Sequence, residues 1–120
     1  MAVGKFYERD GKEKSMIYIT GDTHGNFLRV EEFCRRFQTS REDILIILGD
    51  AGINFSDRYY DALKKKLLES LSITIFAIHG NHEQRPYTID SYREKLWRGG
   101  TVYYEAEYPS LLFARVIYTT

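Results

Sequence analysis

The sequence has little of what marks several common classes of protein. It holds one cysteine among 120 residues, Cys34, so it cannot form an internal disulfide. No apolar run approaches the roughly 20 residues that cross a bilayer, and residues 1–14 are too polar for a signal-peptide core. Basic and acidic residues number 17 each, so no basic field favours nucleic acid or anionic lipid. We therefore expect a soluble, cytoplasmic protein with no membrane segment and no nucleic-acid partner.

The remaining composition indicates one folded domain. Hydrophobic residues make up 43% of the chain, which is typical of globular proteins, and 120 residues fit a single domain. Residues 1–14 are rich in charge and too poor in apolar surface to fold alone. We therefore divide the chain into a polar N-terminal extension, 1–15, and a domain, 16–120. Cys34 falls within a helical pattern, where packing in the core is its expected role.

Three short apolar runs alternate with two helical patterns. The runs are Met16–Thr20, Asp43–Leu48 and Ile73–Ile78. Buried strands separated by amphipathic helices predict a β-α-β-α-β core with a parallel sheet, covered on both faces and joined by right-handed crossovers. Asn26 is the expected cap of the first helix, which extends to about Gln38. Ser56 or Asp57 is the expected cap of the second helix.

The second helical pattern combines an apolar stripe with a run of lysines. The stripe consists of Tyr60, Leu63, Leu67, Leu68 and Leu71. Lys64, Lys65 and Lys66 lie around the stripe. We interpret these lysines as a solvated helix face rather than a ligand site.

The part of the chain beyond Arg85 is less regular and contains no motif. We expect a short helix over Ser91–Trp97 and a turn at Gly99 and Gly100. Two strands, Thr101–Tyr104 and Leu111–Tyr118, should follow, separated by Pro109.

A polar cluster follows each of the three apolar runs. The first contains Asp22 and His24, the second Asp50 and Asn54, and the third His79, Asn81, His82 and Glu83. Because loops after the carboxyl ends of parallel strands lie at one edge of the sheet, we expect the clusters to converge. Carboxylates, imidazoles and an amide oxygen suit divalent ions such as manganese, iron or zinc. Two neighbouring carboxylates, Asp22 and Asp50, would repel each other without metal, and two ions would relieve that repulsion.

Simpler explanations exist for single residues in these clusters. Asp and Asn after a strand often cap helices or form turns, and Asn54 can simply begin a turn. His79 can be a core histidine at the end of its strand, and we leave it out of the site. A nucleotide-binding module without metal chemistry predicts a glycine-rich phosphate loop, and no such loop follows the first strand. A metal site explains all three clusters at once, whereas the alternatives require three coincidences.

The three motifs, in this order, resemble those of the calcineurin-like metallophosphoesterase superfamily. They are Gly21-Asp22-Thr23-His24-Gly25, then Gly49-Asp50, then Gly80-Asn81-His82-Glu83. The resemblance includes serine/threonine protein phosphatase-type enzymes. It implies a four-layer α/β/β/α sandwich, of which this chain would form the N-terminal half with extra C-terminal strands. It also implies phosphoester hydrolysis at two divalent metal ions (Mn, Fe or Zn) by a metal-bound hydroxide. The substrate would be a phosphoprotein, a nucleotide or a small molecule.

The same resemblance implies a role for each residue that matches a motif. Asp22 and His24 would bind the first metal, and Asn81 would bind the second. Asp50 would bridge both metals and so take part in catalysis. His82 would be the catalytic histidine that protonates the leaving-group oxygen as a general acid. Glu83 would orient His82 or its loop rather than bind metal.

The chain also departs from the family pattern in three respects. The second motif lacks the Asp-Arg-Gly sequence of protein phosphatases, and His79 stands where those enzymes have an arginine before the third motif, with Arg85 nearby as a substitute. Both departures weaken the phosphoprotein expectation. No histidine follows His82, whereas the family completes its site with later histidines. We therefore expect a truncated chain, or one complemented by a partner, that binds one metal ion or none. The alternative to an active enzyme is an inactive fragment that self-associates into a homo-oligomer.

Overall fold

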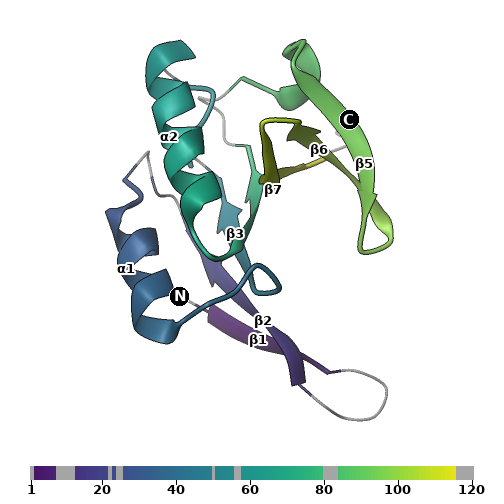
Figure 1. Cartoon of the computed structure of the whole chain (residues 1–120). Coiled ribbons are helices and arrows are strands. Elements are labelled where there is room, and N and C mark those ends of the chain that lie inside the picture. The colour runs from purple at the N-terminus through teal and green to yellow at the C-terminus, as the bar shows by residue number, and fades with distance from the viewer. Residues whose placement is uncertain are drawn as a thin grey trace.

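A computed structural model describes residues 2–7, 13–21, 23, 26–49, 51–55, 58–79 and 84–115. These residues form one seven-stranded mixed sheet, in the order β1-β2-β3-β4-β7-β6-β5, with two α-helices (Figure 1). The strands are β1 Ala2–Tyr7, β2 Glu13–Thr20, β3 Ile44–Leu48, β4 Thr74–Ile78, β5 Tyr92–Trp97, β6 Gly100–Glu105 and β7 Tyr108–Ala114. The helices are α1 Leu28–Phe37, α2 Arg58–Ser70 and a 3-10 turn, η1 Pro86–Thr88. The predicted β-α-β-α-β core is confirmed as β2-α1-β3-α2-β4.

The two α-helices cover the same face of the sheet (Figure 1). β2, β3 and β4 are parallel neighbours, and right-handed crossovers that step in one direction across a sheet put their helices on one side. Val30 of α1 and Leu68 of α2 belong to one core with strand residues that alternate along the sheet. Those strand residues are Tyr18, Leu45, Ile47, Ile75, Ala77, Leu111 and Phe113. In the part of the chain that is described, the α-helices cover only this face, so the expected cover of the opposite face does not come from them.

The opposite face of the sheet is apolar and only partly covered by the described residues. Ile46 and Phe76 alternate with the core positions and are half-buried, and Leu48 is 45% exposed. Trp97, at the end of β5, stacks on Phe76 with the ring centroids 5.2 Å apart. The C-terminal hairpin thus supplies part of the cover for this face.

The segment expected to form a helix over Ser91–Trp97 is instead strand β5, so that prediction is wrong. β5 pairs antiparallel with β6, from Tyr92 opposite Glu105 to Trp97 opposite Gly100. The two residues between the strands, Arg98 and Gly99, have φ values of 51° and 85°. Positive φ at both positions is the geometry of a tight hairpin turn whose twist matches that of the strands. Cross-strand pairing outweighs the helical propensity of the Glu and Lys residues in this segment.

β7 begins earlier than expected and joins the antiparallel β5–β6 hairpin to the parallel strands. It starts at Tyr108, so Pro109 lies within the strand rather than between two strands. β7 pairs antiparallel with β6 and parallel with β4, where Ile75 lies opposite Leu111. Residues 116–118, which we expected to continue the strand, lie outside the described residues.

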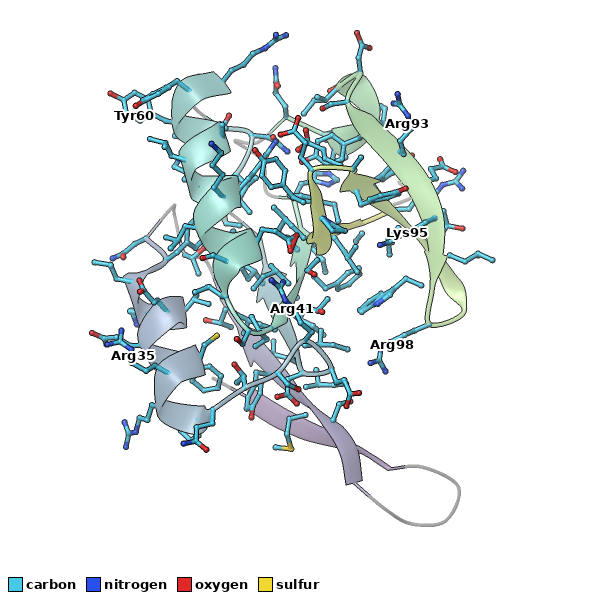
Figure 2. All side chains as sticks on the ribbon, viewed as in Figure 1. Arg35, Arg41, Tyr60, Arg93, Lys95 and Arg98 are labelled. Carbon is cyan, nitrogen blue, oxygen red and sulfur yellow. The ribbon has the colours of Figure 1, made fainter. Side chains whose placement is uncertain are left out.

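Helix α2 buries only part of the apolar stripe that its sequence predicts: Leu68 and Leu71 are buried and Leu67 packs against the core. Its buried residues are Asp61, Lys65 and Leu68, whereas Tyr60 is 56% exposed and points away from the sheet (Figure 2). Leu63, also expected in the apolar stripe, is exposed. Lys65 is 7% exposed, so the interpretation of the lysine run as a solvated face is wrong at this position. A buried lysine needs a partner of opposite charge, and β6 supplies one, as described below.

The expected helix caps are only partly recovered. α1 begins after Phe27 with no side-chain cap, and Asn26 Oδ1 accepts a hydrogen bond from the backbone N–H of Leu28 at 3.4 Å. Gln38 ends the helix in the left-handed conformation, as C-terminal caps commonly do. Ser56 and Asp57 lie outside the described residues. Neither described α-helix is long and apolar enough to span a membrane.

The N-terminal segment extends the sheet at one edge. β1 pairs antiparallel with β2, from Ala2 opposite Ile19 to Tyr7 opposite Glu13. A strand of this kind gains its backbone hydrogen bonds from its neighbour, so it does not require the segment to fold alone. The boundary between an extension, 1–15, and a domain, 16–120, stays a prediction.

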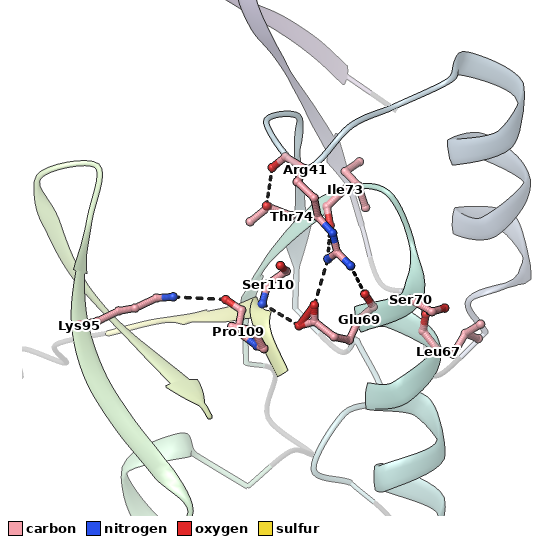
Figure 3. A network of polar contacts seen from close by, with 9 residues as sticks. All are labelled: Arg41, Leu67, Glu69, Ser70, Ile73, Thr74, Lys95, Pro109 and Ser110. Carbon is pink, nitrogen blue, oxygen red and sulfur yellow. Dashed lines mark hydrogen bonds and ion pairs between the residues drawn. The ribbon is translucent and has the colours of Figure 1, made fainter. Parts of the chain in front are cut away.

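An exposed polar network joins the elements at the amino ends of the parallel strands (Figure 3). Arg41 Nη1 lies 3.0 Å from Glu69 Oε2, and the guanidinium also donates to the backbone carbonyl of Glu69. Arg41 further donates to the carbonyl of Ile73, and Ser110 donates its N–H to Glu69 Oε1 at 2.7 Å. The arginine thereby satisfies a carbonyl at the end of α2 and ties the helix to β4 and β7.

Candidate functional site

The predicted site residues Asp22, His24, Asp50, Asn81, His82 and Glu83 lie outside the described residues. Their neighbours in the chain are described, and they define how the three motif segments approach each other. Each segment follows the carboxyl end of a parallel strand: β2 ends at Thr20, β3 at Leu48 and β4 at Ile78. The register between these strands is continuous, so the three ends lie at one edge of the sheet.

The first and second motifs are joined through Thr23. Its hydroxyl Oγ1 donates a hydrogen bond to the backbone carbonyl of Ala51 at 2.8 Å. Thr23 stands between Asp22 and His24 in sequence, and Ala51 directly follows Asp50. The contact spans 28 residues of sequence, so it is a tertiary contact rather than a local turn. Nothing in the sequence indicated a role for Thr23, because a threonine between two candidate ligands carries no periodic signal.

The second and third motifs are joined by a backbone hydrogen bond. The N–H of Gln84 donates to the carbonyl of Asn54 at 2.9 Å. Gln84 directly follows Glu83, the last residue of the third motif. Together with the Thr23 contact, this bond makes the second motif segment the link between the other two. The described flanks of the three motifs therefore converge, as the sheet topology predicts.

The second motif segment has an unusual backbone that is held in place from outside. Gly49, Gly52 and Asn54 have φ values of 84°, 86° and 58°, which lie in the left-handed region. Lys64 Nζ, from α2, donates to the carbonyl of Gly52 at 2.9 Å. The carbonyls of Ala51, Gly52 and Asn54 thus each accept a hydrogen bond from a different segment of the chain. Such contacts can hold a conformation that its own local preferences would not favour.

A cluster of polar side chains lies behind this segment, in which Asn54, Lys65 and Tyr92 are buried, Glu105 is half-buried and Ser91 is exposed. Asn54 is 5% exposed, and its Nδ2 donates to the hydroxyl of Tyr92 at 2.9 Å. Lys65 Nζ lies 2.5 Å from Glu105 Oε1 and 5.2 Å from the centre of the Tyr92 ring. Ser91 Oγ donates to Glu105 Oε2 at 2.7 Å. We call these five residues, Asn54, Lys65, Ser91, Tyr92 and Glu105, the Tyr92 cluster.

The charges in the Tyr92 cluster balance each other. Burial acts to raise the pKa of the Glu105 carboxyl, but hydrogen bonds from Lys65 and Ser91 and the charge of Lys65 outweigh it and lower that pKa. Burial raises the pKa of the Tyr92 phenol well above its ordinary value, and the nearby Glu105 charge adds to the rise. The phenol therefore keeps its proton. It can donate that proton to Glu105 while it accepts a hydrogen bond from Asn54.

His79 lies at the carboxyl end of β4 and is buried, as expected of a core histidine. Burial lowers the pKa of its imidazole, and the positive charge of Arg85 lowers it further. Arg85 is half-buried, follows the third motif in sequence and directly precedes η1. These two residues flank Asn81, His82 and Glu83 on either side.

The described residues contain no group of three or more His, Cys, Asp or Glu side chains that could hold a metal ion. The predicted donors, Asp22, His24, Asp50 and Asn81, supply carboxylate, imidazole and amide oxygen. That donor set fits a divalent ion of intermediate hardness. The hydrogen bonds between their described neighbours bring the three segments to one place, which a shared ion requires.

The residues that support the site could not be recognised from local sequence. Tyr92 and Glu105 fell in a segment without motifs, and Lys64 and Lys65 were assigned to solvent. One signal was present in the sequence: Asp61, Lys65 and Leu68 share a helix face at a spacing of three and four residues. That spacing alone does not identify a buried pair, because the partner of Lys65 lies 40 residues away.

Comparison with known families gives a match over most of the chain. The family described as calcineurin-like phosphoesterase matches residues 15–117. Comparisons with curated proteins and with solved structures gave no significant match.

Proposed function

The chain belongs to the calcineurin-like phosphoesterase family, and on that premise we propose that it forms a divalent-metal site for phosphoester hydrolysis. The site lies at the carboxyl edge of the parallel strands. One observation carries the proposal: the Thr23–Ala51 and Gln84–Asn54 hydrogen bonds join the flanks of all three motifs. The family uses divalent metal ions and acts on phosphoesters, so the chemistry of the donor set and that of the family agree.

The proposed ligands come from all three segments. Asp22 and His24 would hold a first ion, Asn81 would hold a second, and Asp50 would serve both ions. Bound ions supply positive charge that stabilises a phosphoryl transition state and activates water as a nucleophile. Manganese, iron and zinc all suit this mixture of oxygen and nitrogen donors.

His82 acts in this proposal as the general acid. Protonation of the leaving-group oxygen requires an imidazole at the edge of the ligand set, and His82 directly follows the ligand Asn81. Glu83 orients His82 or its loop. Arg85, half-buried and close after the third motif in sequence, offers a guanidinium to a phosphate oxygen. The substrate class is a phosphoester, with a nucleotide or small molecule favoured over a phosphoprotein because the Asp-Arg-Gly sequence is absent.

The test measures metal binding and turnover on the same purified chain. Titration with Mn²⁺ followed by calorimetry gives affinity and stoichiometry, and an aryl phosphate reports hydrolysis. We expect Asp50→Asn to abolish turnover and to weaken Mn²⁺ binding by at least about tenfold. Asp90→Asn is the matched control, because it makes the same chemical change at an exposed position. Mn²⁺ affinity that is equal in Asp50→Asn and Asp90→Asn would contradict the proposed ligand set.

A second candidate is an inactive chain that associates with its own copies. Its support is the partly covered face of the sheet, where Leu48 is 45% exposed beside half-buried Ile46 and Phe76. An apolar face of this kind favours association over solvation. Light scattering across a range of concentrations tests it, with Leu48→Lys as the disruptive variant and Leu96→Lys, on β5, as the exposed control. A chain with less than one bound metal, no turnover and a mass that Leu48→Lys lowers would favour this candidate.

A further inference from the structure

The Tyr92 cluster lies outside the three motifs and yet contacts the segment that joins them. Asn54 takes part in two hydrogen bonds with different parts of the chain. Its side-chain amide donates to the Tyr92 hydroxyl, and its backbone carbonyl accepts from Gln84. Both bonds are 2.9 Å long. Asn54 therefore connects the end of the second motif to the residue that follows the third.

The conformation of Asn54 needs this support. Its φ of 58° is left-handed, a region that asparagine tolerates better than most residues but rarely occupies without local stabilisation. The side chain is almost fully buried, so an unbonded amide would be costly. The hydroxyl of Tyr92 is its bonding partner at the base of the loop.

Tyr92 is itself held firmly. Its hydroxyl lies beside the Glu105 carboxylate, which Lys65 and Ser91 hold in place. Its ring lies under the Lys65 ammonium and packs edge-on against Phe113, with the ring centroids 5.6 Å apart. Residues of β6, β7 and α2 thus fix the tyrosine independently of its contact with the loop.

From this arrangement we propose that Tyr92 is a positioning residue for the metal site. Its hydroxyl fixes Asn54, and Asn54 fixes the spacing between the second and third motif segments. Tyr92 touches neither substrate nor metal in this role. The effect of Tyr92 on metal binding rests on the proposed function. Its effect on the loop rests on the described hydrogen bonds alone.

The test compares two tyrosine-to-phenylalanine variants in the whole chain. Tyr92→Phe removes the hydroxyl that Asn54 contacts. Tyr108→Phe is the matched control, because Tyr108 is also buried beside Lys65, with the ammonium 6.0 Å from its ring centre. No hydrogen bond from the described part of the second motif segment to the Tyr108 hydroxyl is recorded, whereas the Tyr92 hydroxyl has one.

The first measurement does not need metal. Amide hydrogen exchange followed by NMR reports the Gln84 N–H, whose bond to Asn54 should open more often in Tyr92→Phe. We expect its exchange to become about tenfold faster relative to the amide of Ile46 in the central strand β3, which reports global stability. Tyr108→Phe should leave the ratio of the two rates within about twofold of the unaltered chain. An unchanged ratio in Tyr92→Phe overturns the proposal.

The second measurement is Mn²⁺ affinity by calorimetry. Loss of a residue that orients ligand-bearing segments typically weakens metal binding by about 10- to 100-fold, and we expect a loss in that range for Tyr92→Phe. An unchanged Mn²⁺ affinity, in a chain that does bind the ion, overturns the positioning role even if exchange accelerates. If the unaltered chain binds no Mn²⁺, the proposed function fails, and the exchange measurement still decides whether Tyr92 fixes the loop.

Asn54→Gly provides a second variant for the same bond. Glycine accepts the left-handed backbone at no steric cost and removes only the side-chain amide. If Asn54 and Tyr92 act through one hydrogen bond, the double variant should show the same Gln84 exchange ratio as the stronger single variant, within about twofold. If the change in the Gln84 exchange ratio in the double variant equals the product of the two single changes, the residues act independently. That result would overturn the proposed pathway.

Discussion

The two ends of the parallel strands are held together in different ways. At the amino end, a partly exposed ion pair between Arg41 and Glu69 joins α2 to the segment before β3, with side chains 45% and 20% exposed. At the carboxyl end, hydrogen bonds to the loop do the joining: the half-buried side chains of Thr23 and Lys64 and the backbone N–H of Gln84 each donate to a loop carbonyl. The amino end thus depends on an ion pair with an exposed arginine, whereas the carboxyl end depends on hydrogen bonds to carbonyls of the second motif segment.

This difference between the two ends predicts that contacts at the amino end affect mainly stability, whereas contacts at the carboxyl end also affect the geometry of the site. An exposed ion pair gains little free energy and tolerates changes in length, because water can replace either partner. Buried hydrogen bonds are intolerant of change, because a lost partner leaves a polar group unsatisfied. The intolerant contacts occur at the end where the candidate ligands occur. Four predictions probe this comparison, in order of decreasing effect on stability.

Removal of the Lys65 charge should have the largest effect. Lys65→Met leaves the Glu105 carboxylate buried without its ionic partner, and we expect a loss of about 3 kcal/mol in the free energy of unfolding. Denaturant unfolding measures the loss, with Lys66→Met, at the exposed neighbouring position, as the control. The double variant Lys65→Met/Glu105→Gln should recover part of the loss. Equal stability of Lys65→Met and Lys66→Met would show that the pair contributes nothing.

Removal of Arg41 should cost less and should leave the site unaffected. Arg41→Ala removes the contacts with Glu69 and Ile73, and we expect a loss of about 1 kcal/mol in stability. Mn²⁺ affinity should stay within about twofold of the unaltered chain, because the network lies at the opposite end of the strands. Arg35→Ala, on the exposed surface of α1, serves as the control. A marked loss of metal affinity in Arg41→Ala would erase the distinction between the two ends.

Thr23→Val should lower metal affinity more than it lowers stability, the reverse of what we expect for Arg41→Ala. Valine keeps the shape of threonine but loses the hydrogen bond to Ala51, and we expect stability to fall by less than about 1 kcal/mol. Mn²⁺ affinity should fall by about tenfold, because the bond joins the first motif to the second. Calorimetry and denaturant unfolding on the same preparation give both values. Thr88→Val, at an exposed position where the hydroxyl bonds only the nearby Arg85 carbonyl, is the control.

Acidification should have the smallest effect on stability. The pKa of Glu105 in the folded chain lies below its ordinary value of 4.5, so the unfolded chain binds this proton more readily. The stability that Glu105 contributes is therefore present above about pH 4.5 and is lost as the pH falls through its lower folded pKa. Thermal unfolding between pH 6 and pH 3 measures the slope, which should be shallower in Glu105→Gln. An equal slope in both chains would show that Glu105 does not contribute to the pH dependence of stability.

Much of the fold could be predicted from local sequence. The three apolar runs, each stopped by a polar cluster, correctly indicated β2, β3 and β4, and the spacing between them indicated α1 and α2. Convergence of the motif flanks followed from the parallel topology and is visible in the Thr23 and Gln84 contacts. The roles of Asp22, His24, Asp50, Asn81 and His82 remain predictions, since these residues lie outside the described part of the chain.

The errors occurred where a residue's environment comes from distant parts of the chain. Ser91–Trp97 has residues that favour a helix, but pairing with β6 across the Arg98–Gly99 turn makes most of it a strand. Lys65 stands in a lysine run that usually faces water, but Glu105 offers a buried carboxylate. Local sequence propensity contains no information on either distant partner, β6 or Glu105.

The sequence by itself determined the order of the strands and helices of the core, the family and the three motifs. These depend on periodicity and on residue types that are close together in the chain. Only the tertiary structure decided which face of α2 is buried, and that Tyr92 supports the loop through Asn54. The physical reason is distance along the chain: Asn54 and Tyr92 are 38 residues apart, and Lys65 and Glu105 are 40. Such contacts arise only when the sheet brings β5 and β6 beside the second motif segment.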